Sequence, residues 1–161
     1  MASASTRLAE LGLELPQVAA PVAAYVPAIR VGDVVYSSGQ LPSVAGQLVA
    51  TGKVGAEVSA ETGAECARTA ALNALAAVSE QAGGIDEIEQ VIRVVIFVAS
   101  AADFTGQPQV GNGASAVLRE IFGEAGRHAR SAVGVAVLPL DAPVEVELVV
   151  QVRGRPRVVP A

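Results

Sequence analysis

The chain has 161 residues, of which 52% are hydrophobic and 17% charged, and its formal net charge is −5 at pH 7. This length suits one domain. The apolar content argues against disorder, because disordered chains combine low hydrophobicity with high net charge. The acidic balance and an aromatic content of 3% argue against a nucleic-acid surface, which needs basic groups and aromatic rings for stacking. We therefore expect a single globular domain that does not bind nucleic acid.

The single cysteine and the single histidine restrict disulfide and metal chemistry. Cys66 alone cannot form an intramolecular disulfide or a multi-cysteine zinc site, and His128 alone cannot form a histidine-rich site within one subunit. We expect no metal and no organic cofactor. The longest apolar run, over residues 91–102, contains Arg93 and falls short of the roughly 20 residues that span a membrane. No signal peptide is recognised, so we expect a cytoplasmic protein without a membrane partner.

The first part of the chain predicts a short helix followed by a β-hairpin. The helix is expected within residues 1–15, with Ser5 as its N-cap and Gly12 at its end. Two β-rich runs, 26–31 and 34–37, are separated by a Gly-Asp pair that is typical of a hairpin turn.

The rest of the chain alternates helices and strands. An apolar stripe with a 3.6-residue period begins after Ser59 and ends at Gly83, which predicts a helix over 59–82. The sequence then predicts, in order, a strand over 91–98, a helix over 113–122, and strands over 130–138 and 144–152. Strands and helices in this order predict an α+β domain, a mixed sheet with two helices on one face. The expected organisation is an N-terminal extension over 1–20, a single domain over 21–153 and a tail over 154–161.

The two faces of each of the last two strands differ in composition. Over 144–152, one face is entirely valine and leucine, and the other carries Glu145 and Glu147. Over 130–137, one face is valine-rich, and the other carries Arg130 with alanine and glycine. We expect both valine-rich faces to lie under the helices. Because small residues permit close approach by another backbone, we expect the face with Arg130 and the glutamates to pack against other subunits and to line a cleft.

Three segments, in this order, resemble the RidA family (reactive intermediate deaminase A, also called the YjgF or L-PSP endoribonuclease family). They are Tyr25, the run Tyr36-Ser-Ser-Gly-Gln-Leu-Pro42, and Ala129-Arg-Ser-Ala-Val-Gly-Val-Ala-Val-Leu-Pro139 with the following Val144-Glu-Val-Glu147. The resemblance covers about residues 20–153. Two departures indicate a divergent branch, because Ala129 stands where the family pattern has proline and Ala132 where it often has cysteine.

The resemblance implies a chorismate-mutase-like fold assembled as a homotrimer with clefts between subunits. Active family members hydrolyse enamine and imine intermediates such as 2-aminoacrylate to 2-keto acids and ammonia. By motif, Arg130 is expected to grip the substrate carboxylate, for which its planar fork is suited, and Glu145 to hold the attacking water. The other expected substrate-binding residues are Tyr25, Ser38, and either Asn112 or Ser115.

Alternatives remain open at the level of function and of single residues. A trimer that binds a 2-keto acid or another small carboxylate without catalysis is the main alternative. Ribonuclease activity is disfavoured by the acidic charge and the few aromatic residues. Arg130 could instead form an ion pair with Glu145 or Glu147, and Ser38 could serve only the backbone. We expect His128 to be an exposed polar residue.

Overall fold

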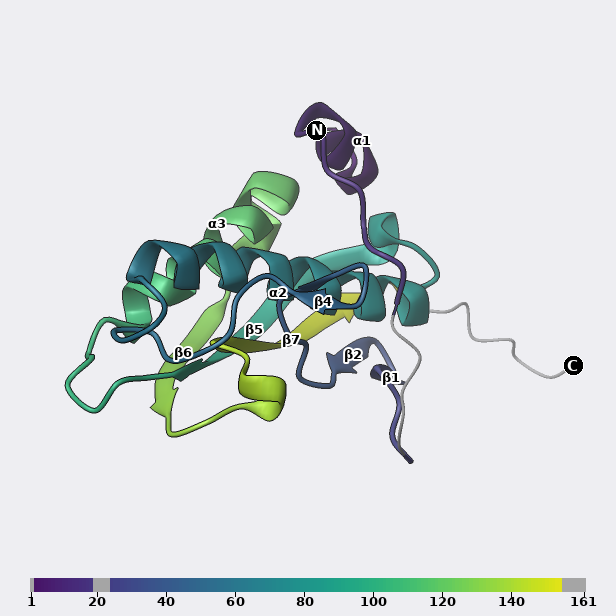
Figure 1. Cartoon of the computed structure of the whole chain (residues 1–161). Coiled ribbons are helices and arrows are strands. Elements are labelled where there is room, and N and C mark those ends of the chain that lie inside the picture. Colours follow the sequence, from purple (N-terminus) through teal and green to yellow (C-terminus); the bar gives the residue numbers. More distant parts are fainter. Residues whose placement is uncertain (1, 19–23, 155–161) are drawn as a thin grey trace, which may run out of the picture.

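The computed structural model describes residues 2–18 and 24–154, and it shows one five-stranded sheet with two helices across one face (Figure 1). The elements are α1 (Ala4–Glu10), β1 (Ala28–Val31), β2 (Val34–Ser37), β3 (Ser43–Val44), β4 (Gln47–Leu48), α2 (Ala60–Ala82), η1 (Ile85–Glu87), β5 (Ile88–Ala99), α3 (Gln107–Phe122), η2 (Gly123–Gly126), β6 (Ala129–Val135), η3 (Pro139–Asp141) and β7 (Val144–Val152). The predicted α+β architecture, with α2 and α3 on one face of a mixed sheet, is confirmed. Residues 155–161 of the predicted tail lie outside the described residues.

The sheet has the strand order β1-β2-β7-β5-β6. Only the pair β5–β6 is parallel among these neighbours, and the other three pairs are antiparallel. The small β3–β4 hairpin is a separate two-stranded sheet. As a result β1 and β6 form the two edges, and β7 lies at the centre.

Helix α2 forms where the sequence predicts it. The Ser59 hydroxyl accepts a hydrogen bond from the backbone N–H of Thr62 at 3.1 Å, which satisfies a donor of the first turn. Gly83 ends the helix in the left-handed conformation, with φ of 93°, which costs glycine little because it has no Cβ.

No helix in the described ranges is long and apolar enough to cross a membrane.

Helix α3 is longer than predicted and begins at Gln107 instead of residue 113. Gly111 and Gly113 lower the intrinsic helix propensity, which is why the predicted start was late. Packing explains Gly113. A Cβ on Gly113 would overlap the Ala64 carbonyl of α2, and Gly111 is buried where α3 meets β6. Close helix packing therefore outweighs propensity in this segment.

Strand β6 turns its valines away from the helices, so the prediction for this strand is wrong. Arg130 is paired with Val94 and Ala132 with Ile96, and both β5 partners are fully buried beneath the helices. Since side chains alternate along a strand, Arg130 and Ala132 share the face that α3 covers, whereas Val133 is 45% exposed on the other face. The physical reason is that α3 lies close to this edge strand, where small side chains fit beneath it. For β7 the prediction is confirmed, because its valine and leucine face is buried.

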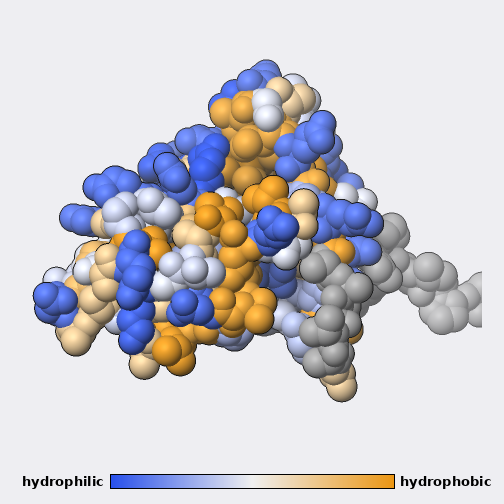
Figure 2. Space-filling view, viewed as in Figure 1, coloured by the Kyte–Doolittle hydropathy of each residue, from blue (hydrophilic) through white to orange (hydrophobic). Residues whose placement is uncertain are grey.

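The sheet face opposite the helices, which we call the open face, is not covered by any described element. Its apolar residues include Ile29, Val31, Tyr36, Val95, Phe97, Val133 and Val149, and its charged residues are Arg93, Glu145 and Glu147. Val31 is 62% exposed and Ile29 55% exposed. In Figure 2, hydrophobic surface reaches the lower side of the molecule, below the helix layer. Such a face is typical of a surface that meets another protein chain.

Helix α1 is shorter than predicted, with Ser3 and not Ser5 as its N-cap. Ser5 instead attaches the helix to η1, because its backbone N–H and its hydroxyl donate hydrogen bonds to the two carboxylate oxygens of Asp86, at 2.9 and 2.6 Å. Leu8 is buried on the inner side of the helix. The hydrogen bonds from Ser5 hold the pKa of Asp86 below its ordinary value.

We predict that Asp86→Ala loosens α1 without unfolding the domain. The lost bonds are exposed, so the expected effect is a roughly fivefold rise in amide hydrogen exchange within α1, corresponding to about 1 kcal/mol. Acid should act in the same direction in the wild type. A carboxyl whose pKa is lower in the folded state stabilises it above the unfolded pKa of about 4, and this contribution is lost as the pH falls through the folded pKa.

Asp103→Ala is the matched control for this prediction, since Asp103 is an exposed carboxylate beyond the C-terminal end of β5, whereas Asp86 and α1 lie at the N-terminal end of that strand. Unchanged exchange of α1 in Asp86→Ala, or an equal rise in Asp103→Ala, would show that Asp86 does not hold the helix.

Candidate functional site

The Arg130 guanidinium lies at the edge of the sheet, against α3. Nη1 donates hydrogen bonds to Asn112 Oδ1 at 2.9 Å and to Ser115 Oγ at 3.1 Å, and Nη2 donates to the Pro108 carbonyl at 3.2 Å. Gly111 lies beside the guanidinium, since a Cβ placed on it would make an ordinary contact of 3.4 Å with Nη1. The structure thus brings Arg130 together with both Asn112 and Ser115, of which the sequence expected one.

Arg130 keeps hydrogen-bonding capacity beyond these three bonds. A guanidinium has five N–H groups, and the contacts with described residues use three of them, which leaves one N–H on Nε and one on Nη2. Two adjacent N–H groups match the two oxygens of a carboxylate. Within residues 2–18 and 24–154, no Asp or Glu oxygen lies within 4.0 Å of this guanidinium. The site can therefore bind an external anion.

His128 extends this cluster, and the sequence-based expectation of an exposed residue is wrong. Its Nε2 lies 2.9 Å from Ser115 Oγ, and its Nδ1 lies 2.6 Å from the Gly126 carbonyl. Burial, together with the positive charge of Arg130, lowers the pKa of His128, although the hydrogen bond to Gly126 opposes the shift. The spacing of two residues between His128 and Arg130 suggested a shared side of the extended chain, but a lone histidine in a loop was expected to be exposed.

Glu145 lies on the open face, above the backbone of Gly39. A Cβ on Gly39 would overlap the Glu145 carboxylate, so glycine is what allows the carboxylate to occupy this position. Partial burial raises the pKa of Glu145, and the negative charge of Glu147 adds to the shift. A carboxyl with a raised pKa can exchange protons closer to neutral pH.

The segment around Ser38 continues from β2 along β7. The Ser38 hydroxyl donates to the Val26 carbonyl at 2.7 Å, so its described contact is with the backbone. Gln40 exchanges two backbone hydrogen bonds with Val146, which places Gly39 beside Glu145. Tyr25 precedes β1 and is 53% exposed.

The predicted site residues fall into two sets on opposite faces of the sheet. Arg130 belongs to the helix-covered face, as its pairing with the buried Val94 shows. Glu145 is paired with Phe97 on the open face. The expectation that Arg130 and the glutamates share one face is therefore wrong, and an ion pair between Arg130 and Glu145 does not form within the chain.

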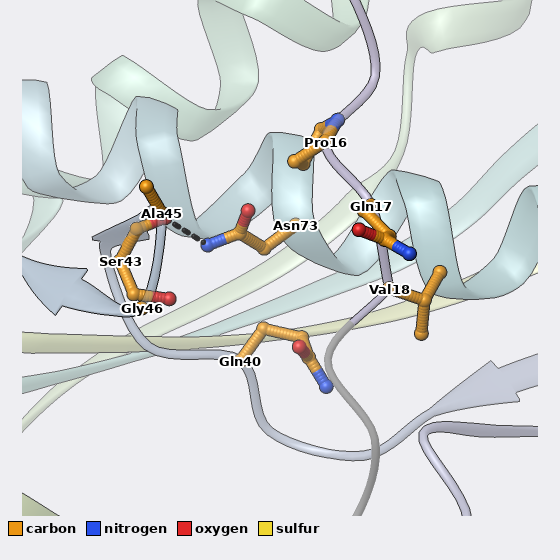
Figure 3. Close-up of a pocket in the computed structure, with 8 residues that line it drawn as sticks. All are labelled: Pro16, Gln17, Val18, Gln40, Ser43, Ala45, Gly46 and Asn73. Carbon is orange, nitrogen blue, oxygen red and sulfur yellow. Dashed lines mark hydrogen bonds between the residues drawn. The ribbon is translucent and has the colours of Figure 1, made fainter.

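A separate pocket of about 490 Å³ lies between α2, the β3–β4 hairpin and residues 16–18 (Figure 3). Its polar groups are the side chains of Gln17, Gln40, Ser43 and Asn73. The Asn73 amide donates to the Leu41 and Ser43 carbonyls at 2.8 and 3.0 Å, so it fastens the hairpin to α2. None of the predicted site residues lines this pocket. Among the described residues, no group of three or more His, Cys, Asp or Glu side chains is arranged to hold a metal ion.

Comparison with known proteins assigns the chain to a family. Residues 5–152 match the family model described as "YjgF/chorismate_mutase-like, putative endoribonuclease". Protein TCP17 of Trypanosoma cruzi is 41% identical over 150 residues, which are 91% of this chain and 92% of that protein. The 2-iminobutanoate/2-iminopropanoate deaminase of Dermatophagoides farinae is 32% identical over 139 residues, 86% of this chain and 93% of the relative.

Solved structures agree with the family assignment. Atu1372 of Agrobacterium tumefaciens, a protein described as having unknown function, is 41% identical, with a TM-score of 0.86 and 94% coverage of both chains. The yjgF gene product of E. coli is 28% identical, with a TM-score of 0.62 and coverage of 84% of this chain and 94% of that chain. Both the extent of the family match and the shared fold lead to one conclusion: this chain belongs to the YjgF/chorismate mutase-like family, in which its sequence motifs resemble those of RidA.

Proposed function

We propose that the protein hydrolyses small carboxylated enamines and imines, of the 2-aminoacrylate type, to 2-keto acids and ammonia. The observation that carries this proposal is the Arg130 guanidinium, which Asn112, Ser115 and Pro108 hold while two N–H groups remain for a ligand. The relative from Dermatophagoides farinae, which is named for deamination of 2-imino acids, supports the same reaction class.

Arg130 binds the carboxylate of the imino acid through two parallel charge-assisted hydrogen bonds. Water held by Glu145 attacks the imine carbon, and the carboxylate passes a proton of the water to the nitrogen. The proton of the new hydroxyl group then follows to the nitrogen through the same carboxylate. The C–N bond then breaks as the carbonyl forms, which releases ammonia and the 2-keto acid. No electrons are transferred, so this reaction needs no redox cofactor.

Arg130 and Glu145 serve the same substrate only if they come from different copies of the chain. Within one copy they lie on opposite faces of the sheet. We therefore propose a homotrimer in which the β6 edge of one copy meets the open face of the next, so that each cleft joins Arg130 of one subunit to Glu145, Ser38 and Tyr25 of its neighbour. The exposed valines, Ile29 and Tyr36 of the open face provide the apolar surface that such an interface buries.

We predict that Arg130→Lys raises KM for the imine about 10- to 100-fold, because lysine keeps the charge and loses the two-pronged geometry. The measurement is pyruvate and ammonia release, above the uncatalysed rate, from 2-iminopropanoate generated in situ by an amino acid oxidase. Arg127→Lys is the matched control, since Arg127 is exposed three residues away and pairs with Glu124.

Equal KM values for Arg130→Lys and the wild type would contradict the proposed role of the guanidinium. Pyruvate binding that depends on Arg130, without any acceleration of imine hydrolysis, would instead favour the non-catalytic trimer that binds small carboxylates.

We predict that Gly39→Ala lowers kcat at least about tenfold while the protein remains folded. The added methyl displaces the Glu145 carboxylate, which is the end of a flexible side chain, and Gly39 does not use the left-handed region that disfavours alanine. Thermal unfolding checks the fold, and a double-mutant cycle checks the cause. In a Glu145→Gln background, Gly39→Ala should have no further effect on kcat. If Gly39→Ala lowers kcat by the same factor in both backgrounds, Gly39 does not act through Glu145.

A further inference from the structure

His128 is the only histidine of the chain. A continuous series of hydrogen bonds connects it to Arg130 through Ser115. A carbonyl oxygen can only accept, so the 2.6 Å contact between His128 Nδ1 and the Gly126 carbonyl places the ring proton on Nδ1. In the neutral ring Nε2 is then an acceptor. The Ser115 hydroxyl, 2.9 Å away, donates its proton to it.

The direction of these hydrogen bonds makes Ser115 an acceptor toward Arg130. With its only proton donated to His128, the Ser115 oxygen presents its lone pairs to the site, and Arg130 Nη1 donates to it at 3.1 Å. The far end of the run is also fixed, because Gly126 is buried so tightly against α3 that a Cβ would overlap the Leu118 carbonyl. A packed backbone carbonyl is thereby connected to the guanidinium through two side chains.

We propose that His128 is a positioning residue for anion binding, which holds Ser115 as an acceptor and so orients the Arg130 guanidinium toward the carboxylate of the ligand. The inference rests on the proposed function, since it gives the role of a second residue in the same site.

The surroundings of His128 keep its ring neutral. Ser115 of α3, Gly126 of η2 and Arg130 of β6 face the ring, and of these Arg130 is charged and positive. The Arg127 side chain is directed to Glu124, at 3.3 Å. Partial burial and the charge of Arg130 lower the pKa of His128, so the neutral form prevails at neutral pH. A protonated ring would direct Nε2–H at the Ser115 oxygen and compete with Arg130 for it.

Two substitutions separate positioning from structural support. His128→Gln places an amide near the position of Nε2, where it can accept from Ser115, whereas His128→Asn places one near Nδ1, where it can donate to Gly126. We expect His128→Asn to raise KM roughly three- to tenfold, with kcat within about twofold of wild type, because one hydrogen bond that orients the ligand-binding group is lost. We expect His128→Gln to restore KM to near the wild-type value. A nitrogen-15 NMR spectrum of the single histidine should show the Nδ1–H tautomer.

A purely structural role predicts the reverse order, with His128→Asn close to wild type and His128→Gln impaired. That order, equal KM values in all three proteins, or an Nε2–H tautomer would overturn the positioning role. If the wild type does not hydrolyse imines, the proposed function fails. The positioning role of His128 is then tested separately, by calorimetric measurement of pyruvate binding to the same variants. Weaker binding in His128→Asn alone would support positioning, and equal affinity or no binding by any of them would overturn it.

Discussion

Side chains alternate between the two faces of a β-strand, and in this protein that alternation separates Arg130 from Glu145. Arg130 is paired with Val94 of β5, which is buried beneath the helices, whereas Glu145 is paired with Phe97 on the open face. The residues proposed to bind the carboxylate and to hold the water thus occur in the same chain but cannot meet in one copy. The proposed trimer follows from this geometry. The exposed apolar side chains of the open face support it, because an interface between subunits would bury them.

The second constraint is the close approach of α3 to its neighbours. Gly113 allows α3 to approach the α2 backbone, and Gly111 lies beside the Arg130 guanidinium. The first turns of α3 then supply Pro108, Asn112 and Ser115 as acceptors. Gly113, which weakens a helix in isolation, is therefore explained by the close contact between α3 and α2.

The sequence predicted the parts of the fold that depend on local signals. Helix α2 has a serine cap, an alanine stripe and a terminal glycine, and β7 has strict alternation, so both were predicted correctly. The start of α3 and the faces of β6 were not, because each depends on how closely two elements pack, which composition does not encode. The family resemblance indicated Asn112 or Ser115 as a pocket residue, but the hydrogen bonds of Arg130 to both were not predicted. His128 was missed because its partners, Ser115 and the Gly126 carbonyl, become neighbours only after α3 folds back onto β6.

Subunit mixing tests most directly whether Arg130 and Glu145 of different copies form one site. Arg130→Ala and Glu145→Gln should each inactivate the protein alone. In hybrids assembled at random from equal amounts of the two variants, about one quarter of the clefts would combine an intact Arg130 with an intact Glu145 from the neighbouring subunit. We therefore predict recovery of imine hydrolysis to about one quarter of the wild-type rate. Hybrids no more active than either parent would contradict the shared site, because a site within one chain cannot be restored when every chain carries a defect.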